Sequence, residues 1–159
     1  MLMVRLRGAR RAARDDGRAI IEVVFLAVLL LIPTMYILIA LLRLQAATLA
    51  VAQAARDAGR LIETSTSGSV GEPLIRAVAG QDLQDQGITP DTMTVRAVAS
   101  GSDCRQAPAV APSYQPGATY DLCVIAQITL PGVPTVLSGS HNTVTGVYTV
   151  HIGQLREGS

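Results

Sequence analysis

The longest apolar segment of this chain starts near residue 19 and contains no charge between Val23 and Leu42. Twenty such residues in a helix are long enough to cross the roughly 30 Å hydrocarbon core of a bilayer. A cleaved signal peptide has a shorter apolar region, and the small-residue sequence Gln45-Ala46-Ala47 lies beyond Arg43, outside a suitable cleavage position. The pattern therefore predicts a membrane-spanning helix that stays in the protein.

The helical pattern continues beyond the apolar run, because residues 43–62 are rich in alanine and contain no proline. The predicted helix 18–62 would be roughly 65–70 Å long, and Pro33 should kink it within the membrane. A narrow stripe of mostly small residues fits packing against the protein's own C-terminal domain or against another subunit, and the sequence leaves both open. Its members recur at spacings of three and four: Leu41, Leu44, Thr48, Val51, Ala55, Ala58 and Ile62.

Residues 63–159 form the remaining part of the chain, which is rich in glycine, serine, threonine and proline. Residues 63–71 are expected to form a polar hinge. Residues 72–86 predict a short helix, with Pro73 in its first turn and Gly87 at its end.

Alternating apolar and polar residues predict three strands in the same part of the chain, at 92–99, 120–130 and 143–152. Two irregular segments, 100–118 and 131–139, separate the strands, and the first is expected to be an exposed loop. Together these elements predict a small α+β domain with one short helix and about three antiparallel strands. The pattern does not specify the order of the strands.

Arginines are distributed unevenly about the apolar run, although the net charge is only +1. Arg43 stands alone immediately after the run, whereas six arginines precede it: Arg5, Arg7, Arg10, Arg11, Arg14 and Arg18. By the positive-inside rule, the N-terminus lies in the cytoplasm and the C-terminal domain is exported. A net charge near zero argues against a nucleic-acid partner, so we interpret these arginines as a topology signal.

Cys104 and Cys123 are the only two cysteines, and an exported pair without competitors is most simply a disulfide. The bond would close an eighteen-residue gap that holds the proline-rich segment, and it would contribute about 3 kcal/mol. A zinc site made of both cysteines with His141 and His151 is the alternative, but the spacing does not resemble a compact zinc site.

The sequence contains no recognisable catalytic motif: we find no glycine-rich phosphate loop, no G-x-S-x-G and no carboxylate pair in a catalytic setting. Asp82 and Asp85 are expected on the solvated face of the short helix. No cofactor site and no small-molecule substrate are evident. We therefore predict a non-catalytic protein, with a hydrolytic or redox domain as a remote alternative.

Glu22 lies just inside the start of the apolar run, where a carboxylate is costly unless it has a function or reaches the headgroups. The sequence Gly17-Arg18-Ala19-Ile20-Ile21-Glu22-Val23-Val24-Phe25 resembles the processing and assembly signal of type IV pilin-like proteins. With the stretch Ala54-Ala55-Arg56-Asp57-Ala58-Gly59-Arg60 and the ending Leu155-Arg156-Glu157-Gly158, the chain resembles the TadE/TadG-like minor pilins, or pseudopilins, of the actinobacterial tight-adherence (Flp) pilus.

This resemblance implies cleavage after Gly17 by a prepilin peptidase, which would make Arg18 the new amino terminus and Glu22 the fifth residue. In pilin-like proteins that carboxylate pairs with the amino terminus of a neighbouring subunit. Two features depart from the family pattern. Asp15 and Asp16 stand before the cut, where basic residues are commoner, and Arg18 adds a second positive group at the new terminus.

We therefore expect a single-pass plasma-membrane protein with a cytoplasmic leader 1–17, a helix 18–62 and an extracytoplasmic α+β domain 63–159. Its expected function is to prime, cap or anchor a Tad pilus or its assembly platform. The expected partners are the membrane, other pilin or Tad assembly subunits and the prepilin peptidase. The alternative is a single-pass envelope protein whose outer domain binds a ligand or partner unrelated to pili.

Overall fold

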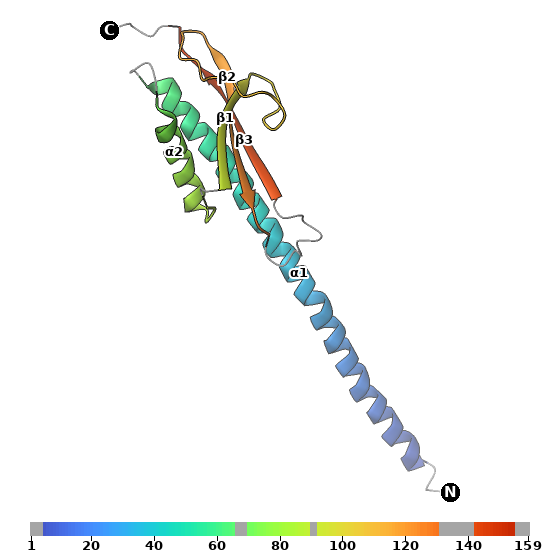
Figure 1. Cartoon of the computed structure of the whole chain (residues 1–159). Coiled ribbons are helices and arrows are strands. Elements are labelled where there is room, and N and C mark those ends of the chain that lie inside the picture. The colour runs from blue at the N-terminus through green and yellow to red at the C-terminus, as the bar shows by residue number, and fades with distance from the viewer. Residues whose placement is uncertain (1–4, 66–69, 90–91, 131–141, 155–159) are drawn as a thin grey trace.

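The computed structural model describes residues 5–65, 70–89, 92–130 and 142–154, with side chains from residue 18 onward. Its elements are α1 (Arg5–Thr64), α2 (Glu72–Asp85), β1 (Met93–Ala99), β2 (Thr119–Ile128) and β3 (Asn142–His151). Figure 1 shows α1 as a long rod that carries the other elements on its C-terminal part, while its N-terminal part projects away from them. The predicted α+β class, with a long helix, a short helix and three antiparallel strands, is confirmed.

The three strands form one antiparallel sheet in the order β1-β2-β3, so neighbours in the chain are neighbours in the sheet. Val95 of β1 lies opposite Val124 of β2, and Leu122 of β2 lies opposite Tyr148 of β3. Each observed strand matches its predicted range within two residues at either end. The predicted irregular segment 131–139, His141 and the ending 155–158 lie outside the described residues.

Small residues of α1 cover one face of the sheet together with α2. Burial along α1 begins at Ala47, so Leu41 and Leu44 of the predicted stripe, which precede it, are exposed. Thr48 is exposed as well, although Ala47 and Ala50 on either side of it are buried. From Ala47 onward the buried stripe is wider than predicted, because α1 contacts both the sheet and α2. Its buried members are Ala47, Ala50, Val51, Ala54, Ala55, Ala58, Gly59 and Ile62.

Two glycines let α1 and β3 meet at backbone distance. A Cβ atom added to Gly146 of β3 would overlap the backbone carbonyl of Val51. A Cβ atom added to Gly59 of α1 would overlap the ring of Tyr148. The contact therefore depends on the missing side chain at one position of each element.

The C-terminal end of α1 is tied to β3 through Glu63. Its carboxylate accepts hydrogen bonds from the Tyr148 hydroxyl at 3.0 Å and from the His151 backbone N–H at 2.8 Å. Burial, followed by the bond to Glu63, raises the pKa of Tyr148 above its ordinary value. Glu63 was expected to open a hinge, but the helix includes it because these contacts fix its side chain.

Helix α2 packs along α1 through Ile75, Ala79 and Leu83. Gly87 follows its last turn with φ +70°, a conformation that favours glycine. Asp85 is exposed as predicted, whereas Asp82 is half-buried, because it faces α1 instead of solvent. Among the described residues its Oδ2 atom has no hydrogen-bond partner, and burial, then Asp57 and Asp85, raise the pKa of Asp82.

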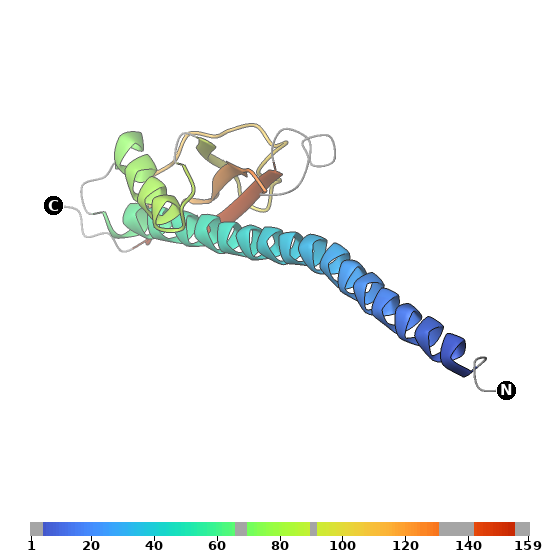
Figure 2. The same cartoon turned by 90° about the horizontal axis from the view of Figure 1, so that it is seen from below.

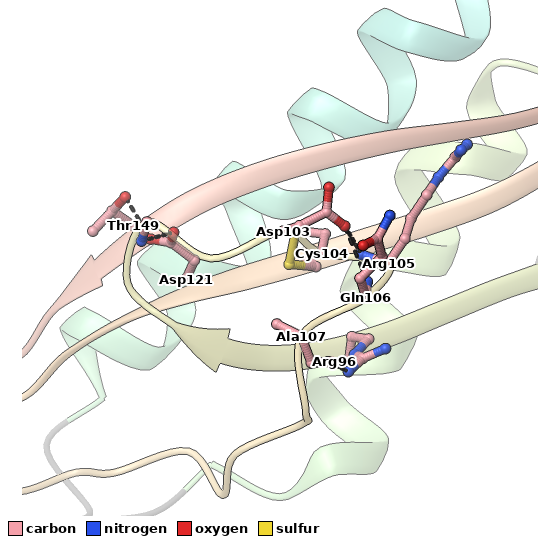
Figure 3. The surroundings of a disulfide bond; sticks show 10 residues. Arg96, Asp103, Cys104, Arg105, Gln106, Ala107, Asp121 and Thr149 are labelled. Carbon is pink, nitrogen blue, oxygen red and sulfur yellow. Dashed lines mark hydrogen bonds between the residues drawn. A yellow bond between two sulfur atoms is a disulfide. The ribbon is translucent and has the colours of Figure 1, made fainter.

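The first part of the 100–118 loop covers the outer face of the sheet, so the expectation of a wholly exposed loop was wrong there. Cys104 and Cys123 form a disulfide with a Cα–Cα distance of 5.8 Å, as predicted, and pack with Val98 and Ala107 as a second small core. Figure 3 shows the loop held across β1 and β2 around this bond. Arg96 of β1 also donates a hydrogen bond to the Ala107 carbonyl.

Asp121 on β2 is the one buried charged residue in the described part of the chain, with 5% of its surface exposed. It accepts hydrogen bonds from the Gly101 N–H and the Thr149 hydroxyl, both at 2.8 Å (Figure 3). Asp103 receives the N–H groups of Arg105 and Gln106, and these bonds lower the pKa of Asp103. The loop is therefore fixed by polar contacts on both sides of the disulfide.

Candidate membrane-spanning and assembly segment

Between Ile20 and Leu44, α1 exposes an almost continuous apolar surface. Large apolar side chains from Ile20 to Leu44 are exposed, whereas comparable residues after Ala47 are mostly buried. Soluble proteins rarely expose an apolar surface of this extent. Within the described residues, one helix is long and apolar enough to cross a membrane, and no residue of its most apolar window is buried. The segment is compatible with a single-pass membrane anchor.

Pro33 lies in the middle of this exposed segment. Proline has no backbone N–H and cannot complete the helical hydrogen bond, so a bend is expected near it. Figure 2 shows α1 bending where its colour passes from cyan to blue, the part of the helix that contains Pro33. The next residue, Thr34, donates its hydroxyl to the carbonyls of Leu30 and Leu31 at 2.9 and 2.8 Å. These bonds keep the hydroxyl satisfied within the helix itself.

Glu22 projects from the first turns of the exposed apolar segment. Among the side chains that the structure describes, none forms a hydrogen bond or an ion pair with it. Arg18, one turn earlier on the same helix, is exposed as well. A carboxylate in hydrocarbon is stable only with a partner or with access to water, and the described residues supply Glu22 with no partner.

The Gly17–Arg18 bond lies inside α1, which begins at Arg5 and not at Arg18. Residues 5–17 and the apolar segment that follows them therefore share one continuous helical backbone. Glycine in a helix interior is about 1 kcal/mol less favourable than alanine. The turn that contains Gly17 is thus intrinsically weaker than alanine-rich turns elsewhere in the helix.

The alternative zinc site finds no support in the geometry. Both cysteine sulfurs belong to the disulfide, and no group of three or more metal-ligating side chains occurs in the described ranges. His151 is exposed, and its Nδ1 atom lies 3.3 Å from the Thr119 hydroxyl.

One group of residues around Arg43 was not predicted from the sequence, because its members come from segments that are far apart in the chain. Arg43 lines a hollow with the turn after α2, at Gly87 and Thr89, and with the end of β2, at Gln127 and Thr129. The position of Arg43 directly after the apolar run was the available signal. It was interpreted only as part of the charge asymmetry.

Comparison with protein-family models, curated proteins and solved structures gives no match.

Proposed function

We propose that this protein is a non-catalytic, membrane-anchored pilin-like subunit of the TadE type, which primes, caps or anchors a tight-adherence pilus or its assembly platform. One observation carries the proposal. A single helix, α1, is apolar and exposed from Ile20 to Leu44 and forms part of the domain core from Ala47 to Ile62. Such a subunit can leave its anchor free for neighbouring subunits while its head is held rigidly by the same helix.

Glu22 supplies the specific chemistry of the proposed assembly. It is the one charged side chain between Ala19 and Leu42, and the described residues of its own chain leave it unpaired. A carboxylate in low dielectric attracts a cation more strongly than it does in water. The amino terminus of a neighbouring subunit, created by cleavage after Gly17, is the cation we assign to it. Pairing is then favoured only when subunits meet in the correct axial register.

The proposed topology places the N-terminus in the cytoplasm, where a prepilin peptidase would reach Gly17, and the domain after α1's membrane segment outside. Six arginines before the apolar run against Arg43 after it support this orientation. The disulfide supports it too, because such bonds persist in oxidising compartments.

Two substitutions in the native host test the proposal. Gly17→Leu should leave the full-length chain in the membrane, because the peptidase needs a small residue before the cut, whereas Gly17→Ala should still be processed. Glu22→Ala should be cleaved but should assemble poorly, because the neighbour's amino terminus loses its partner. Glu72→Ala, which removes an exposed carboxylate from the head, is the matched control. The readouts are the mature N-terminal residue by mass spectrometry and the amount of assembled pilus.

The competing function, an envelope protein that binds a partner without any pilus, predicts a different result. Glu22→Ala would then be harmless or slightly stabilising, because it removes a carboxylate from hydrocarbon. If the native protein begins at residue 1 and Glu22→Ala assembles normally, the pilin mechanism does not apply to this chain.

A further inference from the structure

Two hollows lie close to the point on α1 where its exposed apolar segment ends and its buried segment begins. The first, the Arg43 hollow, is lined by Arg43, Gly87, Thr89, Thr92, Gln127 and Thr129 among others, and has a volume of about 200 Å³. Its walls come from three separate segments: α1, the turn after α2 and the end of β2. The space holds more than a single water molecule, so it can receive a small polar group.

The chemistry of the Arg43 hollow suits an anion. Arg43 is the only charged residue among the described residues that line it. Thr89 and Thr129 bring hydroxyls, and Gln86 and Gln127 bring amides, whereas the Thr92 hydroxyl already donates to the Thr89 carbonyl at 2.8 Å. No ion pair within the described part of the chain occupies Arg43. An arginine surrounded by neutral donors is a typical environment for a phosphate group.

The second hollow, the apolar groove, runs along the membrane segment itself. It is lined by Pro33, Tyr36, Ala40, Leu44 and Leu130 among others, without any charged residue. The two hollows lie close together, because consecutive residues line them at two points of the chain. Arg43 lines one and Leu44 the other, and at the end of β2 Thr129 lines one and Leu130 the other. Ala40 and Arg43 are also three residues apart, which places them on the same face of the helix.

The level of the two hollows relative to the membrane decides what they can bind. Arg43 is the first charge after the uncharged run that ends at Leu42, so it falls at the boundary between hydrocarbon and headgroups. The apolar groove lies on the hydrocarbon side of that boundary. A ligand that fills both must have an anionic head and an apolar tail that are joined at this level.

We propose that the Arg43 hollow and the apolar groove together bind one anionic phospholipid, with the phosphate at Arg43 and an acyl chain along Ala40 and Pro33. This inference rests on the membrane placement in the proposed function but not on the pilus role. The lipid would fill the Arg43 hollow and the apolar groove. It would thereby hold the domain at a fixed distance from the membrane surface.

The test uses the full chain, purified in detergent and stripped of lipid, with bound lipid counted by native mass spectrometry. Three probes are compared: phosphatidylglycerol, phosphatidylcholine with the same acyl chains, and inorganic phosphate. Phosphatidylglycerol should be retained preferentially, and Arg43→Gln should lower its retention about fivefold, the scale expected for one arginine at a lipid surface. Arg56→Gln, an exposed arginine farther along α1 and outside both hollows, should not change retention.

A second pair of variants tests the groove. Ala40→Phe places a ring in the groove and should lower lipid retention, whereas Val28→Phe, on the exposed helix but outside the groove, should not. Equal retention of both lipids, or normal retention by Arg43→Gln, would overturn the proposal. Binding of inorganic phosphate as tight as that of the lipid would overturn it too, because the tail would then contribute nothing. Loss of a dimer in Ala40→Phe with unchanged lipid binding would assign the groove to a second copy instead.

The outcome is separable from that of the proposed function. Flotation of the full chain with vesicles tests the membrane placement itself, and the effect of Glu22→Ala tests the pilus role. A chain that floats with vesicles, assembles through Glu22 and ignores Arg43→Gln would contradict only the lipid site.

Discussion

Gly146 and Gly59 set the distance between α1 and β3, because neither position leaves room for a side chain. At Gly146 the obstacle is the backbone of Val51, which cannot rotate away as a flexible side chain could. At Gly59 the obstacle is the ring of Tyr148, whose hydroxyl is held by Glu63. Replacement at either position must therefore move a fixed group.

The first prediction concerns Gly146. Gly146→Ala should lower the free energy of unfolding of the full chain by about 2 kcal/mol, the middle of the range for overpacked sites. Gly153→Ala is the matched control, because no atom of the described residues lies within 4 Å of a Cβ added there. The measurement is thermal or denaturant unfolding in detergent, followed by circular dichroism. Equal midpoints for the two variants would contradict the close contact of α1 with β3.

The second prediction concerns Asp82, whose pKa is raised by burial and by Asp57 and Asp85. Because the folded chain holds this proton more tightly than the unfolded chain, stability falls as pH rises from about 3.8 through the raised pKa. Above the raised pKa that stability has been lost, so at such pH values Asp82→Asn should be more stable than the native chain by roughly 0.5 kcal/mol, the scale of a like-charge pair one turn apart.

The pH dependence provides the control for the Asp82 variant. Below the ordinary carboxyl pKa of 3.8 both states are protonated, and the gain from Asp82→Asn should disappear. Unfolding midpoints at pH 3 and pH 7 check this. A gain of the same size at both values would mean that charge is not the cause.

At the scale of elements, the disulfide converts an irregular loop into a cover for the sheet. Cys123 lies on the outer face of β2 and is fully buried, because Cys104 and Ala107 are held over it. Without this cover, Val98 of β1 would be exposed as well. The loop therefore supplies the second layer that a three-stranded sheet otherwise lacks on that face.

The third prediction is that replacing both cysteines by serine lowers the free energy of unfolding by about 3 kcal/mol, since the bond spans a sequence separation of 19. Circular dichroism should still show the helices, because the contacts of α1 with α2 and β3 do not involve the loop. The native chain treated with a reductant should match the double variant. If reduction leaves its unfolding midpoint unchanged, the loop is held by its polar contacts alone.

The sequence predicted most elements because their periodicity was clear, as in Tyr120, Leu122 and Val124, which all face the core. The prediction from the sequence was wrong where the burial of a residue depends on a segment that is distant in the chain. Cys123 and Asp121 occupy the polar phase of the same strand, yet both are buried, because the loop folds back over them. Glu63 was taken for a hinge residue because its partners Tyr148 and His151 are more than eighty residues away.

At the scale of the whole molecule, α1 belongs to both parts of the protein. The apolar segment and Glu22 could be found from the sequence, because they depend on consecutive residues of one helix. The Arg43 hollow could not be found in this way, because its walls come from three segments whose proximity follows from the fold. The order of the strands could not be predicted either, because the alternation of apolar and polar residues shows which residues share a face of a strand but not which strands are neighbours.

The fourth prediction concerns orientation in the membrane. A reporter enzyme that is active only outside the cytoplasm should work when fused after Ser159 and should fail when fused within residues 1–14, because the arginines before Val23 hold the N-terminus inside. Enzyme activity in intact cells is the readout, and a cytoplasmic reporter at the same two positions is the control. The reverse pattern would contradict the proposed topology.

The continuity of α1 also fixes how the domain is rotated about the helix axis. Between Leu42, the last residue of the uncharged run, and Ala47, the first buried one, the helix rises by roughly 7 Å without a break. Each residue added in this short interval would turn the domain by about 100° relative to the face that carries Glu22. The number of residues between Leu42 and Ala47 therefore sets the direction in which the domain points relative to Glu22.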